Sequence, residues 1–91
     1  MIREDVYKLI DGEREYQDTD PHNVGHDDIS RSVADWIIFI ERQLSEAKGQ
    51  VYVLDKEKAL CHIRKIAALA VACMEHYDTP RRKRCEDKNP L

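Results

Sequence analysis

No stretch of this sequence approaches the ~20 consecutive apolar residues that a membrane-spanning helix needs. Its first residues, MIRED, lack the basic-then-apolar pattern of a secretion signal. The three glycines are isolated, so the sequence contains neither a P-loop nor a G-x-G-x-x-G motif. The formal net charge of −3 is too small to give the surface a single sign, which argues against a general nucleic-acid binder. We therefore expect a cytoplasmic protein that does not enter membranes.

Cysteine is also scarce. The three cysteines are odd in number and form no C-x-x-C motif, so they do not predict a disulfide framework. Cys61 and Cys73 fall within a helical pattern and are expected to be small buried residues, whereas Cys85 is expected to be a free thiol in a charged tail. A zinc site would require Cys73 and His76 to meet His22 and His26 of a separate loop, and a buried core cysteine is the competing interpretation.

The length of 91 residues predicts one domain, here residues 1–80, followed by a polar tail over residues 81–91. A chain this short buries only about 60–65% of its unfolded surface, so its own core is marginal. Pairing with further copies, as a dimer or a tetramer, would bury more apolar surface. The tail contains the basic run Arg81–Arg84, which is interpreted as a solvated segment, with contact to nucleic acid or to an acidic partner as the alternative.

Apolar periodicity and capping residues predict an all-α fold with three helices. The first helix is expected over residues 3–17, and the turn-rich segment DTDPHNVGHDD over residues 18–28 is expected to be a loop. Ser30 or Ser32 caps the second helix, which is predicted to end at Lys48-Gly49. The segment QVYVL over residues 50–54 is expected to be a connecting loop that covers the helix ends. Asp55 is expected to cap the third helix, which stops before Pro80.

The second and third helices are the long ones, and they are predicted to form an antiparallel pair. Ile38 and Phe39 lie off the main apolar stripe of the second helix, so this helix is expected to contact both the third helix and a second subunit. The residues predicted to be buried are Val33, Trp36, Ile37, Ile40, Leu44 and Ala47 in the second helix, and Ile63, Ile66, Ala67, Ala70, Val71 and Met74 in the third.

Two segments carry a family resemblance. The segment EREYQD over residues 13–18 precedes a helix opened by Trp36, and IAALAVACME over residues 66–75 follows. In this order, across residues 6–82, the chain resembles the MazG-like all-α nucleotide pyrophosphohydrolases, especially short phage and bacterial forms. The resemblance implies dimers or tetramers with sites at the subunit seam. It also implies magnesium-dependent hydrolysis of a nucleoside triphosphate to the monophosphate and pyrophosphate.

The family holds magnesium with E-E-x-x-E on one helix and E-x-x-D on the next, because a hard cation needs several oxygen ligands. This chain has Arg42 and Gln43 before Glu46 in the first motif, and His62 and Lys65 in the second. Glu46 alone is insufficient to hold the metal. We therefore expect that hydrolysis is lost, and that magnesium would be a cofactor only if it were retained.

A nucleotide could still bind if Arg42, His62 and Lys65 neutralised its phosphates directly. The competing interpretation is that these side chains are solvated helix surface. By resemblance, Tyr16 and Gln17 are candidate nucleobase contacts. Trp36 is expected to anchor the core, with stacking on a base as the alternative. The alternative function is a non-enzymatic interaction protein, a phage or mobile-element accessory built on the same helical scaffold.

Overall fold

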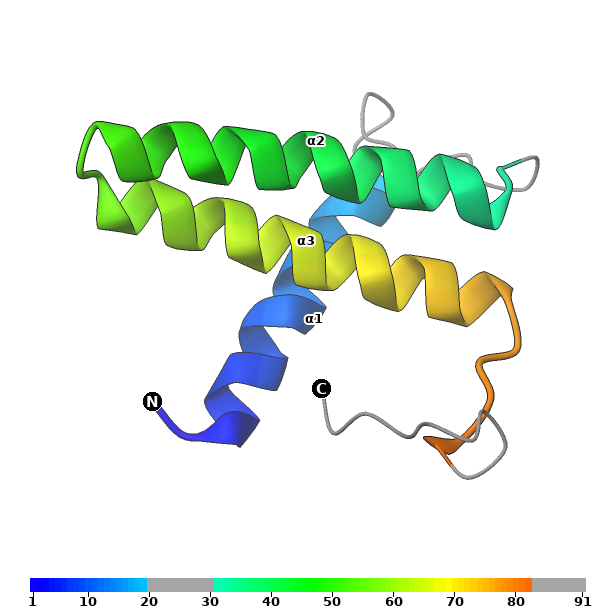
Figure 1. Ribbon diagram of the computed structural model, residues 1–91. Coiled ribbons are helices and arrows are strands. Elements are labelled where there is room, and N and C mark those ends of the chain that lie inside the picture. The colour runs from blue at the N-terminus through cyan, green and yellow to red at the C-terminus, as the bar shows by residue number, and fades with distance from the viewer. Residues whose placement is uncertain (20–30, 83–91) are drawn as a thin grey trace.

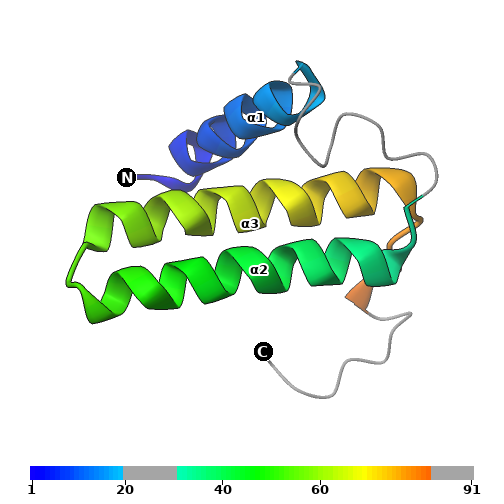
Figure 2. The same cartoon turned by 90° about the horizontal axis from the view of Figure 1, so that it is seen from above.

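A computed structural model describes residues 1–19 and 31–82 of the chain, which form three α-helices. They are α1 (Arg3–Thr19), α2 (Val33–Tyr52) and α3 (Lys56–His76). The two long helices lie side by side and antiparallel, as the sequence predicts, and α1 crosses α3 (Figure 1). Seen from above, α1 lies on the side of α3 that faces away from α2 (Figure 2), and within the described residues it packs on α3 but not on α2.

The predicted capping residues open both long helices. At the start of α2, the Ser32 hydroxyl accepts a hydrogen bond from the Asp35 amide at 3.2 Å, and the Asp35 carboxylate accepts one from the Ser32 amide at 2.8 Å. These bonds from Ser32 lower the pKa of the Asp35 carboxyl. At the start of α3, the Asp55 carboxylate accepts a hydrogen bond from the Lys58 amide at 3.0 Å. The side chains thus satisfy amides that a helix start leaves without partners.

The predicted end of α2 at Lys48-Gly49 is wrong, because the helix continues through Gly49 to Tyr52. One glycine lowers helix propensity by only about 1 kcal/mol, which tertiary packing overrides. The helix ends instead in a Schellman motif, in which the Leu54 amide donates to the Val51 carbonyl and the Asp55 amide donates to the Gln50 carbonyl. Leu54 adopts the left-handed conformation, with a φ of 58°, that glycine usually supplies at this position.

The expectation that residues 50–54 form a loop covering the helix ends is also wrong. Gln50, Val51 and Tyr52 form the last turn of α2, and only two residues and the cap Asp55 separate it from α3. Val51, Tyr52, Val53 and Leu54 all expose more than half of their surface. The first helix, α1, runs two residues past its predicted end, to Thr19. At the other end of α3, Tyr77 is extended and stops the helix as predicted.

The buried core is small, and it sits between α2 and the middle of α3. Trp36 and Leu69 are its large members, and Ala47, Ala68 and Ala72 fill the space where the helices approach. Phe39, Ile40 and Cys73 pack against this cluster and are partly buried. The core therefore depends on close approach at alanines rather than on many large side chains.

The predicted buried stripes are partly wrong. In α2, Trp36 and Ala47 are buried, but Val33, Ile37 and Leu44 are exposed. In α3, the buried residues are Ala68, Leu69 and Ala72, whereas Ile63 and Met74 are exposed and Ile66, Ala67, Ala70 and Val71 are only partly buried. The reason is that α3 contacts α2 and α1 on other faces, so most of the stripe predicted from the sequence is left partly or fully exposed by the described residues.

The structure also bears on the expected burial of Cys61 and on the expected absence of a membrane-spanning helix. Cys61, predicted to be buried, is exposed, because its position on α3 lies at the margin of the α1 contact. In the described part of the chain, the helices are too short or too polar to span a lipid bilayer.

Candidate functional site

A polar cluster joins the two long helices. We call Arg42, Gln43, Glu46 and His62 the α2–α3 polar cluster. His62 Nδ1 lies 2.8 Å from the Gln43 amide oxygen and 3.5 Å from the Glu46 carboxylate. Arg42 lies one turn before Glu46, and their charged groups are 3.8 Å apart. The structure thus brings together three of the residues that the sequence assigns to the nucleotide site, namely Arg42, Glu46 and His62.

Exposure differs strongly within this cluster. The His62 side chain is 15% exposed, whereas that of Arg42 is 81% exposed. Lys65, also predicted for this site, lies almost one turn after His62 on α3 and is partly buried. Lys65 makes no hydrogen bond or ion pair with the described residues. Arg42 and Lys65 are therefore the cations that a phosphate could reach, but the Glu46 carboxylate beside Arg42 would repel it.

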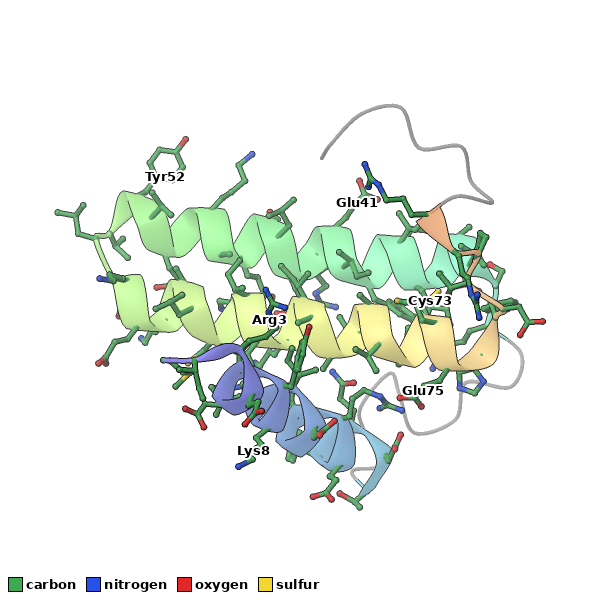
Figure 3. All side chains as sticks on the ribbon, turned by 90° about the horizontal axis from the view of Figure 1, so that it is seen from below. Arg3, Lys8, Glu41, Tyr52, Cys73 and Glu75 are labelled. Carbon is green, nitrogen blue, oxygen red and sulfur yellow. The ribbon has the colours of Figure 1, made fainter. Side chains whose placement is uncertain are left out.

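The donor set does not fit magnesium. Glu46 is the carboxylate at this seam, and its two oxygens face Arg42 and His62. Figure 3 shows Glu41 on the edge of α2 that is remote from α3. Among residues 1–19 and 31–82, no three His, Cys, Asp or Glu side chains are grouped as metal ligands would be. A magnesium ion that needs near-octahedral oxygen ligands has too few here.

The three remaining residues of the predicted nucleotide site lie apart. Gln17 is buried and its amide oxygen is 3.4 Å from the Arg14 guanidinium, whereas the neighbouring Tyr16 is 54% exposed on another face of α1. Trp36 is fully buried, with Phe39 at its edge and His76 stacked at a centroid distance of 6.1 Å. Its indole N–H has no partner in the described part of the chain. Trp36 is thus a core anchor, and its ring is not open to a nucleobase.

The segment that carries the family resemblance attaches α1 to α3. Arg14 is 7% exposed and donates two hydrogen bonds, of 3.0 and 2.9 Å, to the two carboxylate oxygens of Glu75. Arg14 also pairs with Asp18 at 3.0 Å. Next to it, the buried Glu13 accepts a hydrogen bond from Arg64 at 2.8 Å. Sequence analysis missed these ion pairs, although Glu13, Arg14 and Gln17 have the spacing of one helix face.

These contacts shift the pKa values of their members. The hydrogen bonds from Arg14 lower the pKa of the Glu75 carboxyl, and they raise that of the Arg14 guanidinium above its already high value. The bond to Glu13 likewise raises the pKa of Arg64. Both arginines therefore stay charged. The effect of low pH on the α1–α3 contact then depends on protonation of the Glu75 carboxylate.

The other candidate sites receive less support. His76 stacks on Trp36 and Cys73 packs against the core, while His22 and His26 lie outside the described residues. Arg81 and Arg82 are exposed, and the rest of the basic run lies beyond the part of the chain that the structure describes.

The α2–α3 pair carries an exposed apolar surface that we call the hairpin face. In α2, Ile37, Leu44 and Val51 recur every seven residues and are 48–63% exposed. Leu44 lies two residues from both Arg42 and Glu46, about 200° of helix rotation, so it points to the side of α2 opposite these members of the polar cluster. On α3, Ile63 follows His62 by one residue, about 100° of rotation, and points in a different direction. The hairpin face comprises Val33, Ile37, Leu44 and Val51 of α2 and Ile63 and Met74 of α3.

On α3 the hairpin face borders the contact with α1. Arg64 and Glu75 contact α1, and Ile63 and Met74 each precede one of them by a single residue, or about 100° of rotation. Ile63 also lines the groove between α1 and α3.

Compared with known protein families, curated proteins and solved structures, this chain matches none. The MazG-like resemblance therefore remains a prediction from the residues that carry it.

Proposed function

We propose that this chain is a non-enzymatic helical interaction protein that pairs with a second copy of itself through the hairpin face. The observation that carries the proposal is the heptad stripe of Ile37, Leu44 and Val51, each about half exposed or more, beside Ile63 and Met74 of α3. Two such helix pairs packed face to face would form a four-helix bundle with apolar residues at its seam.

The exposed area is of the size that such pairing needs. The six side chains of the hairpin face leave roughly 600 Å² exposed, compared with about 800 Å² per partner in a standard interface. Partly buried neighbours such as Ile66 and Ala70 extend the surface at its centre. A monomer would keep this surface in water while relying on a core of Trp36, Leu69 and three alanines.

The polar cluster supports the non-enzymatic part of the proposal. By the resemblance, a MazG-like scaffold would hold magnesium with carboxylates at the seam of its helices, and the residues that the resemblance aligns with those carboxylates are Arg42, Gln43, His62 and Lys65. Glu46 remains, but its oxygens pair with cationic or polar neighbours. We expect no magnesium-dependent release of pyrophosphate from any deoxynucleoside triphosphate. Release that disappears in Glu46→Gln would refute this part.

Nucleotide binding without turnover is the second candidate, because Arg42 and Lys65 are accessible or partly accessible cations near one seam. It predicts that a nucleotide raises the melting temperature, by an amount equivalent to ~2.7 kcal/mol at a hundred times its dissociation constant. The double variant Arg42→Glu and Lys65→Glu should abolish the shift. Lys8→Glu, on a different helix, is the control and should leave it intact.

Self-association is tested by the dependence of unfolding on protein concentration. If folding is coupled to pairing, the melting temperature of the chain should rise as its concentration increases, because mass action favours the associated folded state. A melting temperature that stays constant across a hundredfold range of concentration would contradict pairing in this range.

A further inference from the structure

The turn between α2 and α3 is an apolar projection. We call residues Val51–Leu54 the tip. Tyr52 is 85% exposed, Val53 68% and Leu54 90%, and Figure 3 shows Tyr52 projecting away from both long helices. The Schellman hydrogen bonds and the Asp55 cap hold this short turn in a defined conformation. The tip is thus a compact group of four neighbouring apolar side chains that the described residues leave exposed.

A groove of about 510 Å³ opens between the first half of α1 and α3. Its walls are almost entirely apolar, and Glu57 and Arg64 are the charged residues that line it. In Figure 1 the N-terminus and the α2–α3 turn lie at the same end of the molecule, so the groove and the tip are neighbours. The residues that line the groove include Val6, Leu9 and Ile10 of α1 and Leu60, Cys61 and Ala67 of α3.

We propose that the tip of one copy of this chain occupies the α1–α3 groove of a second copy, and that the contact is reciprocal. This interface goes beyond the hairpin-face pairing, with which it shares Val51 of the tip and Ile63 at the groove. The tip cannot fill the groove of its own chain, because Asp55 fixes it at the start of the same helix that forms one groove wall. In a dimer with two-fold symmetry, each copy can insert its uncharged tip into the apolar groove of the other, because both features lie at the same end of the chain.

The area is sufficient for a second copy. The four tip residues expose roughly 600 Å². The apolar residues at the groove add several hundred Å² more, namely Met1, Val6, Leu9, Leu60 and Ile63. The sum exceeds the surface of about 800 Å² that each partner buries in a standard interface. The apolar tip gives no charge complementarity to an anionic surface, since Lys56 and Lys58 are balanced by Asp55 and Glu57. A second copy therefore accounts for both the tip and the groove, whereas a foreign ligand would account for one.

Cys61 in the groove provides a direct test. Val53→Cys, made in a Cys85→Ser background and treated with a mild oxidant, should form a disulfide between Cys61 of one copy and the new thiol of another, because a disulfide needs Cβ atoms about 4 Å apart. A non-reducing gel should show a cross-linked dimer. The dimer should be absent when Cys61→Ser is added and when the new cysteine is placed by Ile38→Cys, at a site of similar exposure (58%) on the outer side of α2.

A folded Val53→Cys protein, checked by circular dichroism, that forms no cross-linked dimer would overturn the proposal, as would a dimer that persists after Cys61→Ser. Flotation of the chain with phosphatidylcholine vesicles, lost in Leu54→Asp and without cross-linking, would assign the tip to a lipid surface instead and would also overturn it. These failures leave the hairpin-face pairing untouched, because Ile37→Asp tests that pairing at residues outside the tip and the groove.

Discussion

Replacing Arg14 by methionine should detach α1 while leaving the α2–α3 pair folded. Within the described residues α1 packs on α3 alone, and Arg14 reaches across the boundary to both carboxylate oxygens of Glu75. Contacts with Gln17 and Asp18 of its own helix hold the guanidinium in place. Methionine retains the apolar stem of the arginine and removes its charge and donors. The two carboxylates left behind are about half exposed, so they can be rehydrated.

The magnitude follows from this exposure. Breaking a fully buried ion pair costs 3–5 kcal/mol, while exposed pairs contribute about 0–1 kcal/mol. The Arg14 contacts are intermediate, since the arginine side chain is 8% exposed and those of Glu75 and Asp18 are 50% and 54% exposed. We therefore expect a loss of about 2 kcal/mol in the free energy that opposes α1 opening, which corresponds to about a 30-fold increase in opening.

Native-state hydrogen exchange measures this opening directly, because locally unfolding units exchange together. In Arg14→Met, amides of α1 should exchange about 30-fold faster, while those in the middle of α2 and α3 should keep their protection. Lys8→Met is the matched control, since Lys8 is an exposed cation on the same helix. Equal loss of protection in all three helices, or no change in α1, would refute the account of how α1 is attached.

Three further variants test other features. Arg14 lowers the pKa of the Glu75 carboxyl below its usual 4.5, so the docking of α1 should be fully stable above about pH 4.5. Docking should weaken as the pH falls through the pKa of Glu75 in the folded state, and amide exchange in α1 should then become faster. Glu75→Gln should make α1 amide exchange less dependent on pH. Gly49→Ala should stabilise the protein by about 1 kcal/mol in chemical denaturation, since no atom lies within 4 Å of the added Cβ, and a loss of stability would contradict the helical end of α2. Leu54→Gly should raise the melting temperature at low protein concentration by relieving about 1 kcal/mol of left-handed strain, whereas an unchanged or lower value would argue against the Schellman turn.

Helix content and helix starts could be predicted because they depend on local chemistry. Ser32 and Asp55 cap their helices through side chains only three residues from the amides they satisfy. The end of α2 could not be predicted in this way, since Gly49 is tolerated inside the helix and Leu54 adopts a conformation that its residue type disfavours. The stopping point depends on the packing of the whole helix pair.

Rotation of the helices was the harder problem. The third helix carries apolar residues on more than one side, and its periodicity alone favoured Ile63 and Met74 as core residues. Contact with α1 and α2 instead buries Ala68, Leu69 and Ala72, because small residues permit the closest approach of helices. The ion pairs of α1 were missed for a related reason: Arg14 and Glu75 are 61 residues apart, and only the fold brings them together.

The candidate site was predicted in part. Spacing placed Arg42 and Glu46 on one side of a helix, and the antiparallel arrangement brought His62 to them. Gln17 is buried beside Arg14, whereas Tyr16 is exposed on another face of α1, and spacing alone did not separate these two environments. The burial of Trp36 followed from its place on the apolar stripe.

The central claim, pairing through the hairpin face, is tested most directly by sedimentation velocity on two adjacent variants. Ile37 and Ile38 have nearly the same exposure, 53% and 58%, but only Ile37 belongs to the hairpin face. We expect Ile37→Asp to weaken pairing at least tenfold and Ile38→Asp to pair like the unmodified chain. Equal effects of the two substitutions, or an unmodified chain that sediments as a monomer at every concentration, would contradict the claim.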